Sequence, residues 1–487
     1  MSLGTAIYND LGMKKGSVMA ILSPNCLEYV PVLYGIMMVG VTATTLNPGY
    51  TPGEIAYQLN DSKADSIVIH AALLDNLKKA EPELIKPLKH VVVIGDKPEN
   101  SEHLWYDDLA AGDGESLPKV DIDVKRDIAL LPYSSGTTGR PKGVALSNFN
   151  LAVNVTQTQD GGLMPIEHGV KQLALLPLFH MYGLLMCGNI GVRSGWTMSI
   201  LPAFDPVEFL ETIQNDKIEL MHIVPPLVVF LAKHPLVDNY DLTSIKSIFS
   251  AAAPLGRDTA ELLAKRLPWV DTIRQGYGMT EMSPVSHLDS DQPTMGSVGV
   301  LVSNTEAKFL DPESHEEIEV TPGQVGELCI RGPQVMLGYL NRPEETDATM
   351  TSDGFLRTGD VGHMDEKNHL FIHDRLKELI KVKGLQVAPT ELEDHLISHP
   401  SVSDAAVIAR YDEFAGELPK AYVVKTAGAS ETEENIREWL NGLHAKHKHL
   451  CEVEFIDAIP KNPSGKILRR LLRDKEKASQ AEKAASL

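Results

Sequence analysis

The stretch SSGTTGRPKG, residues 134–143, organises the interpretation of the whole chain. It follows the apolar run 128–131 and precedes the apolar residues 144–146, which predicts a strand, a tight loop and a second strand. Its ten positions hold four hydroxyl side chains, three glycines and two cations. Glycines let backbone N–H groups approach phosphate oxygens, hydroxyls donate hydrogen bonds to them, and a lysine neutralises their charge. The stretch therefore predicts a polyphosphate-binding loop.

Two familiar phosphate loops and an ordinary turn are the alternatives. The G-x-x-x-x-G-K-[ST] loop is excluded because Pro141 stands where its second glycine belongs, and the pattern G-x-G-x-x-G does not fit either. Both loops also need a helix directly after them, whereas Pro141 and the run 144–146 favour a strand. Surface turns are rich in Gly, Ser and Thr, but they rarely combine three glycines with two cations. A phosphate loop of neither familiar type is the prediction.

Size and composition indicate a globular protein of at least two domains. The chain has 487 residues, of which 43% are hydrophobic and 23% charged. A formal net charge of −21 disfavours nucleic acid or an anionic membrane as partner, so any site for a polyanion must be locally basic. The four cysteines lie far apart without ligand spacing and predict reduced thiols in the cytoplasm: Cys26, Cys187, Cys329 and Cys451.

Membrane insertion and export are not expected. Residues 29–46 are uncharged, but Pro31, Gly35, Gly40 and a threonine cluster divide them into a buried helix followed by a strand. No charged-then-apolar leader opens the chain, so secretion is not expected. The last three residues, ASL, loosely resemble the peroxisomal address S-K-L, which leaves the peroxisome as the alternative to the cytoplasm.

Apolar runs alternating with amphipathic stretches predict an α/β fold. The runs 18–22, 66–70, 91–94, 128–131, 198–201 and 220–224 alternate with helical patterns such as residues 206–215, which indicates parallel sheets flanked by helices. Short Gly- and Pro-rich strands after about Gly326 predict a small β-barrel-like module. We expect a large N-terminal domain over residues 1–376 and a small mobile α+β domain over residues 377–487.

Two capping boxes are predicted in the small domain. Thr390 with Glu393 is expected to open a helix that Pro400 ends, and Ser430 with Glu433 a second helix. Strands are expected at 404–409, 421–425 and 452–456. The charged segment 374–383 would join this unit to the large domain.

Seven motifs in order resemble one enzyme family. They are LPYSSGTTGRPKGV (131–144), LPLFHMYG (176–183), QGYGMTE (275–281), GELCIRGP (326–333), TGD (358–360), DRLKELIKVKGLQVAPTELE (374–393) and NPSGKILRR (462–470). Together they closely resemble the acyl-adenylate-forming enzymes, which include acyl-CoA synthetases, firefly luciferase and peptide-synthetase adenylation domains; the 4-coumarate:CoA ligase and luciferase branch is most similar. Family members usually carry several tens of residues before the segment equivalent to residues 11–24, so a shortened N-terminus is expected.

The resemblance implies a two-step reaction with ATP, Mg²⁺ and coenzyme A. A carboxylate attacks the α-phosphate of ATP and expels pyrophosphate, and the CoA thiol then attacks the acyl carbon. The first step brings two anions together, so it needs cations and hydrogen-bond donors where charge develops. By resemblance, the pyrophosphate end is held by Ser134, Ser135, Gly136, Thr137, Thr138 and Lys142, and the nucleotide by Gln275, Gly276, Tyr277, Gly278, Thr280, Asp360 and Arg375.

The same resemblance assigns the residues nearest the chemistry. Glu281 would be the Mg²⁺ ligand beside the α-phosphate, and Lys466 would bridge the carboxylate and the α-phosphate. His180, which alone would be interpreted as a core histidine, would stand at the mouth of the acyl tunnel. Lys377 would be the hinge residue. A second face would contact AMP or CoA during thioester formation. It consists of Lys381, Lys383, Gly384 and Gln386. The lysines of this segment alternate with apolar residues, and an exposed charged turn would explain that pattern equally well.

The acyl pocket that the resemblance outlines is apolar and uncharged. This favours an aromatic or aliphatic acid over an amino acid. Ala251 stands where hydroxycinnamate ligases commonly have glycine, and Met186 where many have a small polar residue, so coumarate is not the expected substrate. Ala203 replaces a lysine that relatives use near CoA, and Asn148 a histidine after the loop. The walls by resemblance are Met181, Tyr182, Met186, Ala251, Ala252, Gly276, Gly278, Pro284 and Val285.

Three functions are compatible with the sequence. The first is an ATP-dependent acid:CoA ligase whose partners are a small carboxylic acid, ATP and CoA. The second keeps adenylation but passes the acyl group to a carrier protein or to oxygen. The third is a nucleotide- or acyl-binding protein without turnover, which the substitutions and the short N-terminus suggest.

Overall fold

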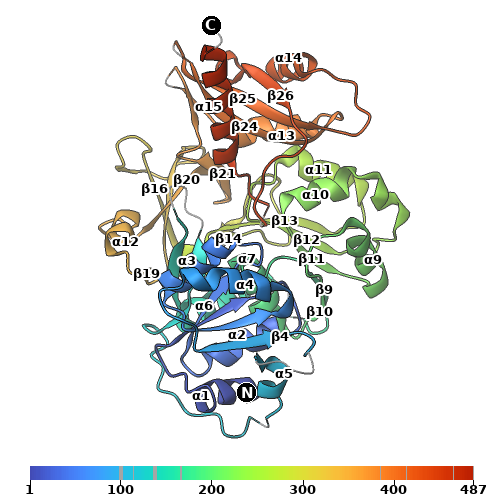
Figure 1. The fold of residues 1–487 in the computed structure, drawn as a ribbon. Coiled ribbons are helices and arrows are strands. Elements are labelled where there is room, and N and C mark those ends of the chain that lie inside the picture. Colours follow the sequence, from blue (N-terminus) through green and yellow to red (C-terminus); the bar gives the residue numbers. More distant parts are fainter. Residues whose placement is uncertain are drawn as a thin grey trace.

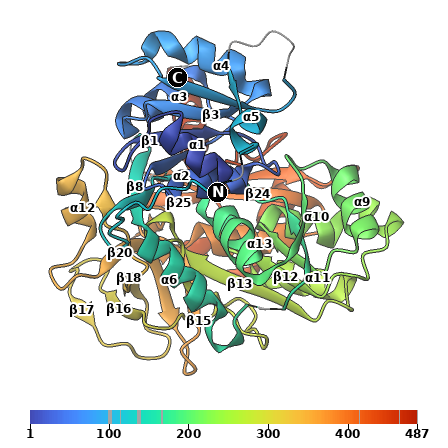
Figure 2. The same ribbon diagram turned by 90° about the horizontal axis from the view of Figure 1, so that it is seen from below.

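The computed structural model describes residues 1–97, 103–112, 114–134, 140–164, 167–383, 385–412, 414–463 and 465–485. A large N-terminal part and a separate C-terminal domain are stacked along the long axis of the molecule (Figure 1). Viewed from below, the first sheet with α1–α5, the second sheet with α9–α11 and the third sheet with α12 form neighbouring groups (Figure 2). The predicted α/β architecture is confirmed.

The first sheet has a parallel centre built from β1, β2, β3 and β4. Its strands are buried runs of apolar and threonine residues, as expected where helices cover both faces. Its order is β19 (Gly338–Tyr339), β8 (Lys142–Ser147), β6 (Ile128–Leu130), β2 (Thr42–Leu46), β1 (Val18–Leu22), β3 (Ser66–His70), β4 (His90–Ile94) and β5 (Leu104–Trp105), with β7 (Tyr133–Ser134) on β8. The accompanying helices are α1 (Ser2–Asn9), α2 (Tyr29–Met37), α3 (Pro52–Ser62), α4 (Leu74–Ala80) and α5 (Tyr106–Ala110).

The segment 29–46 forms a buried helix and a strand, α2 and β2, as predicted. Tyr29, Val32, Leu33 and Ile36 face the main core cluster. Among the described residues, no helix combines the length and apolar character that crossing a membrane requires.

The second sheet of the large part has seven strands. Five neighbouring strands pair in parallel and the last two turn back antiparallel. Its order is β10 (Thr197–Ile200), β9 (Lys171–Ala174), β11 (Leu220–Ile223), β12 (Ser247–Ser250), β13 (Thr272–Gly278), β14 (Val285–Leu288) and β15 (Val300–Leu301). Its helices are α6 (Asn148–Gln159), α7 (Met181–Gly183) continuing into a π-helix (Leu184–Gly191), α8 (Val192–Ser194), α9 (Pro206–Asp216), α10 (Pro225–Lys233) and α11 (Arg257–Arg266).

The predicted β-rich module is a five-stranded antiparallel sheet. Its order is β17 (Glu317–Ile318), β16 (Glu306–Leu310), β18 (Gly326–Arg331), β20 (Leu356–Met364) and β21 (Leu370–Arg375), with α12 (Pro343–Thr349) beside it. The C-terminal domain has its own sheet and core. That sheet runs β23 (Leu385–Val387), β22 (Ile380–Val382), β25 (Gly416–Lys425) and β24 (Val402–Asp412), with β26 (Glu452–Phe455) on β25, and its helices are α13 (Pro389–Ser398), α14 (Glu433–Leu443) and α15 (Arg469–Ala485).

Both predicted helices of the small domain exist, but both predicted capping boxes are wrong. Helix α13 begins at Pro389 behind Ala388, and the Thr390 hydroxyl donates to the carbonyl of His373 instead. Glu393 accepts hydrogen bonds from Arg469 at 2.8 Å. Helix α14 is capped by Thr432, which accepts from the backbone N–H of Asn435. The side chains of Thr390 and Glu393, which the local pattern assigned to capping, therefore form hydrogen bonds with residues outside the helix.

Candidate active site

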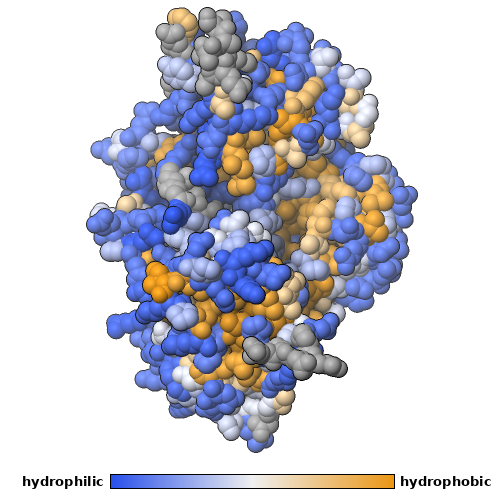
Figure 3. Space-filling model, viewed as in Figure 1, coloured by the Kyte–Doolittle hydropathy of each residue, from blue (hydrophilic) through white to orange (hydrophobic). Residues whose placement is uncertain are grey.

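A cavity of about 900 Å³ lies between the large part and the C-terminal domain. The surface is hollowed there, and apolar groups are visible in the hollow (Figure 3). Strands β7 and β8, the end of β13, the end of β21 and the loop of Lys466 all reach it. Predicted site residues that line it are Ser134, Lys142, His180, Tyr182, Met186, Ala251, Ala252, Gly276, Tyr277, Gly278, Thr280, Glu281, Pro284, Val285, Arg375, Lys377 and Lys466.

The other predicted residues occupy three kinds of position. Gln275, Met181 and Asp360 are buried beside the cavity wall. Lys381, Lys383 and Gln386 are exposed on the β22–β23 hairpin and do not line this cavity. Five lie outside the described residues: Ser135, Gly136, Thr137, Thr138 and Gly384.

Residues outside the motif fix the strands on either side of the phosphate loop. Antiparallel pairing of β7 with β8 places Ser134 opposite Lys142. The Tyr133 hydroxyl donates to Asp61 Oδ2 at 2.8 Å, and Arg342 Nη2 donates to Asp61 Oδ1 at 3.1 Å. The Tyr133 end of the loop is thereby fixed to α3, and Arg342 binds the same carboxylate from the segment before α12.

Lys142 has a protein carboxylate as its partner. Its ammonium forms an ion pair with Glu345 of α12 and lies 4.9 Å from the centre of the Tyr339 ring. The hydrogen bond to Lys142 lowers the pKa of Glu345. A phosphate oxygen could replace that carboxylate, so the pair is compatible with anion binding at this lysine.

Glu281 is buried, 4% exposed, in the turn between β13 and β14. Its Oε1 accepts a hydrogen bond from the Tyr339 hydroxyl at 2.9 Å, so the acid faces the same space as Lys142. The close approach behind it requires glycine, because a Cβ on Gly278 would lie 1.8 Å from the carbonyl oxygen of Pro284. A carboxylate with the Thr280 hydroxyl beside it suits Mg²⁺, a hard cation that keeps several waters.

A second carboxylate, that of Asp360, contacts two residues of the cavity wall, Tyr277 and Arg375. Asp360 Oδ2 accepts from the Tyr277 hydroxyl at 2.6 Å, and Asp360 Oδ1 lies 3.4 Å from Arg375 Nε across the β20–β21 pair. Burial first, and then the Asp360 charge, raises the pKa of Tyr277 well above its usual value. A phenol and a carboxylate at this place can bind the hydroxyls of a ribose.

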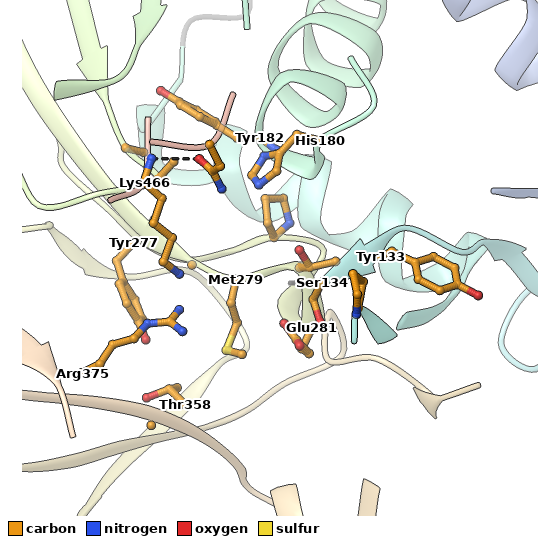
Figure 4. A pocket seen from close by; sticks show the side chains of 18 of the residues that line it. Tyr133, Ser134, His180, Tyr182, Tyr277, Met279, Glu281, Thr358, Arg375 and Lys466 are labelled. Carbon is orange, nitrogen blue, oxygen red and sulfur yellow. Dashed lines mark hydrogen bonds between the residues drawn. The ribbon is translucent and has the colours of Figure 1, made fainter. Parts of the chain in front are cut away.

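Lys466 enters the cavity from the C-terminal domain. Its backbone N–H donates to Asn462 Oδ1 at 2.9 Å, in a tight turn where Gly465 has φ +79°, and its side chain points toward Tyr277 and Arg375 (Figure 4). Burial, and then the Arg375 charge, lowers the pKa of Lys466 to about 8, although Asp360 and Glu281 oppose this shift. The lysine can therefore neutralise an anion that enters between the two carboxylates.

His180 is a neutral group at the same place. Its Nδ1 accepts the backbone N–H of Tyr182 at 3.3 Å, which caps α7, so we assign the ring proton to Nε2. Burial, and then Lys466, lowers the pKa of His180 to about 4. At neutral pH it can donate one hydrogen bond but carries no charge.

The acyl side of the cavity is apolar. Tyr182 donates to the carbonyl oxygen of Phe249 at 3.3 Å, and Met186 and Phe249, both buried, line the same wall. Behind it, His222 stacks on Phe249 with ring centroids 5.1 Å apart, and burial lowers its pKa to about 3. No carboxylate or ammonium group is present among the described residues of this wall, and no formal charge is available to an amino acid's ammonium group there.

Sequence reasoning missed Tyr339, Glu345 and Phe249. The first two lie in GYLNRPEET, residues 338–346, and Phe249 directly precedes the predicted wall residues 251 and 252. The apolar pair Ile248 and Phe249, just before the predicted wall residues, could have suggested Phe249; no local signal distinguishes the other two.

Comparison with known proteins agrees with this geometry. The family model described as AMP-binding enzyme matches residues 2–340, and the model of the AMP-binding enzyme C-terminal domain matches residues 391–466. The chain belongs to the AMP-binding enzyme family. This AMP-binding enzyme is 42% identical over 475 residues to 4-coumarate--CoA ligase 2 of Petroselinum crispum, covering 96% of this chain and 86% of that protein.

Solved structures of similar fold cover nearly the whole AMP-binding enzyme. The anthranilate CoA ligase AuaEII in complex with anthranoyl-AMP superposes with a TM-score of 0.88 at 26% identity, covering 99% of this chain and 91% of that one. ATP-bound MatB from Rhodopseudomonas palustris gives a TM-score of 0.85 at 28% identity, covering 97% and 91%.

Proposed function

We propose that this AMP-binding enzyme is an ATP- and Mg²⁺-dependent acid:CoA ligase that activates a hydrophobic carboxylic acid, aromatic or fatty, as its acyl-adenylate. The observation that carries the proposal is the single cavity that Lys142, Glu281, Tyr277, Arg375 and Lys466 share with an uncharged acyl wall. Membership of the family and similarity to CoA ligases support the same reaction.

The residues divide the first step between charge neutralisation and positioning. An acid that is already ionised needs no general base to attack the α-phosphate, so His180 acts as a neutral donor that orients the carboxylate at the mouth of the acyl pocket. Lys466 offsets the repulsion between carboxylate and α-phosphate, and Lys142 stabilises the charge that develops on pyrophosphate. Glu281 and Thr280 would hold Mg²⁺, which supplies further charge stabilisation when bound. Asp360 and Tyr277 would hold the ribose.

The second step is assigned to the same chain by resemblance. The CoA thiol attacks the acyl carbon, the C–S bond forms and AMP leaves. Lys381, Lys383, Gly384 and Gln386 would face AMP or CoA during this step, with Lys377 as the hinge of a mobile small domain. That second arrangement would require the hairpin to approach the cavity.

The acyl wall supports a hydrophobic acid rather than coumarate. Met186 and Phe249 offer no hydrogen-bonding group to a phenol, and the methyl of Ala251 narrows the space that glycine would leave. A panel of aromatic and fatty acids, scored by acid-dependent AMP release with mass detection of the thioester, identifies the substrate class.

One assay set tests the function. Carboxylate-dependent ATP–pyrophosphate exchange is expected, because acyl-adenylate formation is reversible; its absence with every acid would favour a binding protein without turnover. AMP release that depends on CoA is expected as well. Exchange without CoA dependence would instead indicate a carrier protein or oxygen as acceptor.

The pH dependence of adenylation is a second test. Lys466 acts as a cation, and its pKa of about 8 means that raising the pH through 8 removes its charge. We therefore expect kcat/KM for ATP to fall above about pH 8, because this ratio reports the protonation state of the free enzyme. The value of kcat should fall only at higher pH, because bound phosphate favours the ammonium form of Lys466. Lys466→Arg stays charged, so the residual activity of that variant should show no decline there. A wild-type profile that stays flat to high pH would contradict the assignment.

Two finer assignments are also proposals. The domain boundary at 376/377 is supported by β21 ending at Arg375 in the third sheet and β22 beginning at Ile380 in the next. Cytoplasm is the proposed compartment, supported by four free cysteines.

A further inference from the structure

Helix α13 of the C-terminal domain is bound to α11 of the large part through one carboxylate. Asp394 Oδ1 accepts the Thr259 hydroxyl at 3.1 Å, and the Asp394 carboxylate accepts a backbone hydrogen bond from Asp258. Both donors belong to the first turn of α11, a helix with no side-chain cap of its own. A carboxylate at a helix N-terminus satisfies free N–H groups and is favoured by the helix dipole. Asp394 therefore caps α11 from the other domain.

Gly256, the N-cap residue of α11, shows how tight this contact is. Its φ of −66° and ψ of 154° are open to any residue, so the backbone does not require glycine. A Cβ at this position would, however, lie 1.7 Å from Cγ and Oδ1 of Asp394. The three atoms nearest to such a Cβ all belong to the Asp394 carboxylate of the C-terminal domain, so glycine here serves the docking of that domain.

The C-terminal end of α13 is held by a cation from the large part. Lys233, the last residue of α10, donates through Nζ to the carbonyl oxygens of Ile397, His399 (3.4 Å) and Val402 (3.0 Å). These carbonyls lie at or just beyond the C-terminal end of α13, where a positive charge is favoured. Burial lowers the pKa of Lys233, as expected for an ammonium group enclosed between two domains.

The same helix α10 also supports the loop of Lys466. A Cβ on Gly465 would lie 3.1 Å from Val224 Cγ2 and 3.4 Å from Pro226 Cδ, so this loop rests on the beginning of α10. Helix α10 therefore contacts the residue next to Lys466 at one end and binds α13 at the other. Displacing α13 from α10 and α11 would carry Lys466 away from the cavity, because one folded domain contains both.

We propose that Lys233, Gly256, Thr259 and Asp394 form an interdomain latch that positions Lys466 in the cavity for acyl-adenylate formation. The proposal rests on the adenylating function proposed above. None of the four residues lines the cavity, so they are positioning residues that act through Lys466. The latch explains why a carboxylate meets the N-terminal end of α11 and a cation meets the C-terminal end of α13. It also explains why glycine stands at position 256, where the backbone angles do not require it.

Gly256→Ala is the sharpest variant, because the atoms nearest to its methyl group belong to the docked domain. Acyl-adenylate formation should fall by about tenfold to a hundredfold, the effect expected of a catalytic group displaced by an ångström or more. Thioester formation from supplied acyl-AMP and CoA should stay within about twofold of wild type, and the melting temperature should hardly change. A merely structural role would lower both half-reactions together.

Asp394→Ala provides the matched rescue. It removes the carboxylate that meets the new methyl group, so Gly256→Ala/Asp394→Ala should be no slower than Asp394→Ala alone. Lys233→Met should lower adenylation selectively, while Lys233→Arg, which keeps the cation at the carbonyls, should restore most of it. Additive losses in the double variant, or equal loss in both half-reactions, would overturn the latch.

A readout without turnover separates this inference from the proposed function. Mass-detected acetylation of lysines in the substrate-free protein should label Lys466 faster in Gly256→Ala than in wild type, with Lys475 as an internal reference, because Lys475 pairs with Glu454 within the same domain. Equal labelling of Lys466 in both proteins would refute the latch. Altered labelling in a protein without ATP–pyrophosphate exchange would support the latch and refute the proposed function.

Discussion

Replacing Lys466 by alanine should lower acyl-adenylate formation by about a thousandfold. One preorganised charge where transition-state charge develops commonly contributes two to three orders of magnitude, and we expect the upper end because this lysine lines the cavity together with Glu281. The rate of thioester formation from supplied acyl-AMP should remain near that of wild type, because in this step no free carboxylate approaches a triphosphate. The two half-reactions are measured separately, as acid-dependent ATP–pyrophosphate exchange and as CoA-dependent AMP release from acyl-AMP.

Lys475→Ala is the matched control for this variant. It also removes a lysine of the C-terminal domain, but its partner is Glu454 at 2.7 Å on the surface of the same domain, so neither half-reaction should change. Parallel loss of both half-reactions in Lys466→Ala, with an unchanged melting temperature, would disprove the proposed role in the first step alone.

Glu281→Gln is expected to have the next largest effect. Glutamine keeps the shape of the side chain and can still accept the hydrogen bond of Tyr339, but it removes the charge that a divalent cation requires. Adenylation should fall by about a hundredfold, and the Mg²⁺ concentration for half-maximal rate should rise. The measurement is a Mg²⁺ titration of ATP–pyrophosphate exchange at saturating ATP and acid.

Tyr339→Phe separates the charge of Glu281 from its orientation. It removes the hydrogen bond and leaves the carboxylate, so the rate should fall less than in Glu281→Gln while the Mg²⁺ dependence stays close to wild type. If Glu281→Gln lost rate without any change in Mg²⁺ dependence, Glu281 would not be the metal ligand.

The sequence predicted those parts of the fold whose signals are local. Apolar runs marked the buried strands, such as β1 and β3, to within a residue or two. Residues 29–46 divide into a helix and a strand as predicted, but the break lies at Gly40, whereas Pro31 and Gly35 lie within the helix. The first capping box failed because Thr390 and Glu393 found partners on other elements, His373 and Arg469. The second failed because Thr432, two residues after Ser430, caps the helix instead. A cap is a weak local preference, and a tertiary partner of similar hydrogen-bonding strength replaces it.

The candidate site shows the same division. Motif order identified Lys142, Glu281, Asp360 and Lys466 from the sequence, but only the structure shows that three of them line one cavity and that Asp360 binds two further residues of its wall, Tyr277 and Arg375. The partners of these residues, such as Glu345 for Lys142 and Tyr339 for Glu281, could not have been predicted, because each pair joins positions far apart in the chain and depends on how the sheets dock.

By itself, then, the sequence determined the chemical inventory of this protein: a loop suited to phosphate, carboxylates and cations in a recognisable order, and strands and helices whose periodicity is built into adjacent residues. Tertiary structure alone decided which of these groups meet. Gly256 is the clearest case, since its ordinary backbone angles leave no trace in the local pattern, and the carboxylate that excludes a side chain there lies 138 positions further along, in another domain. Contacts of that kind arise from the docking of separately folded units, a property that no short stretch of sequence contains.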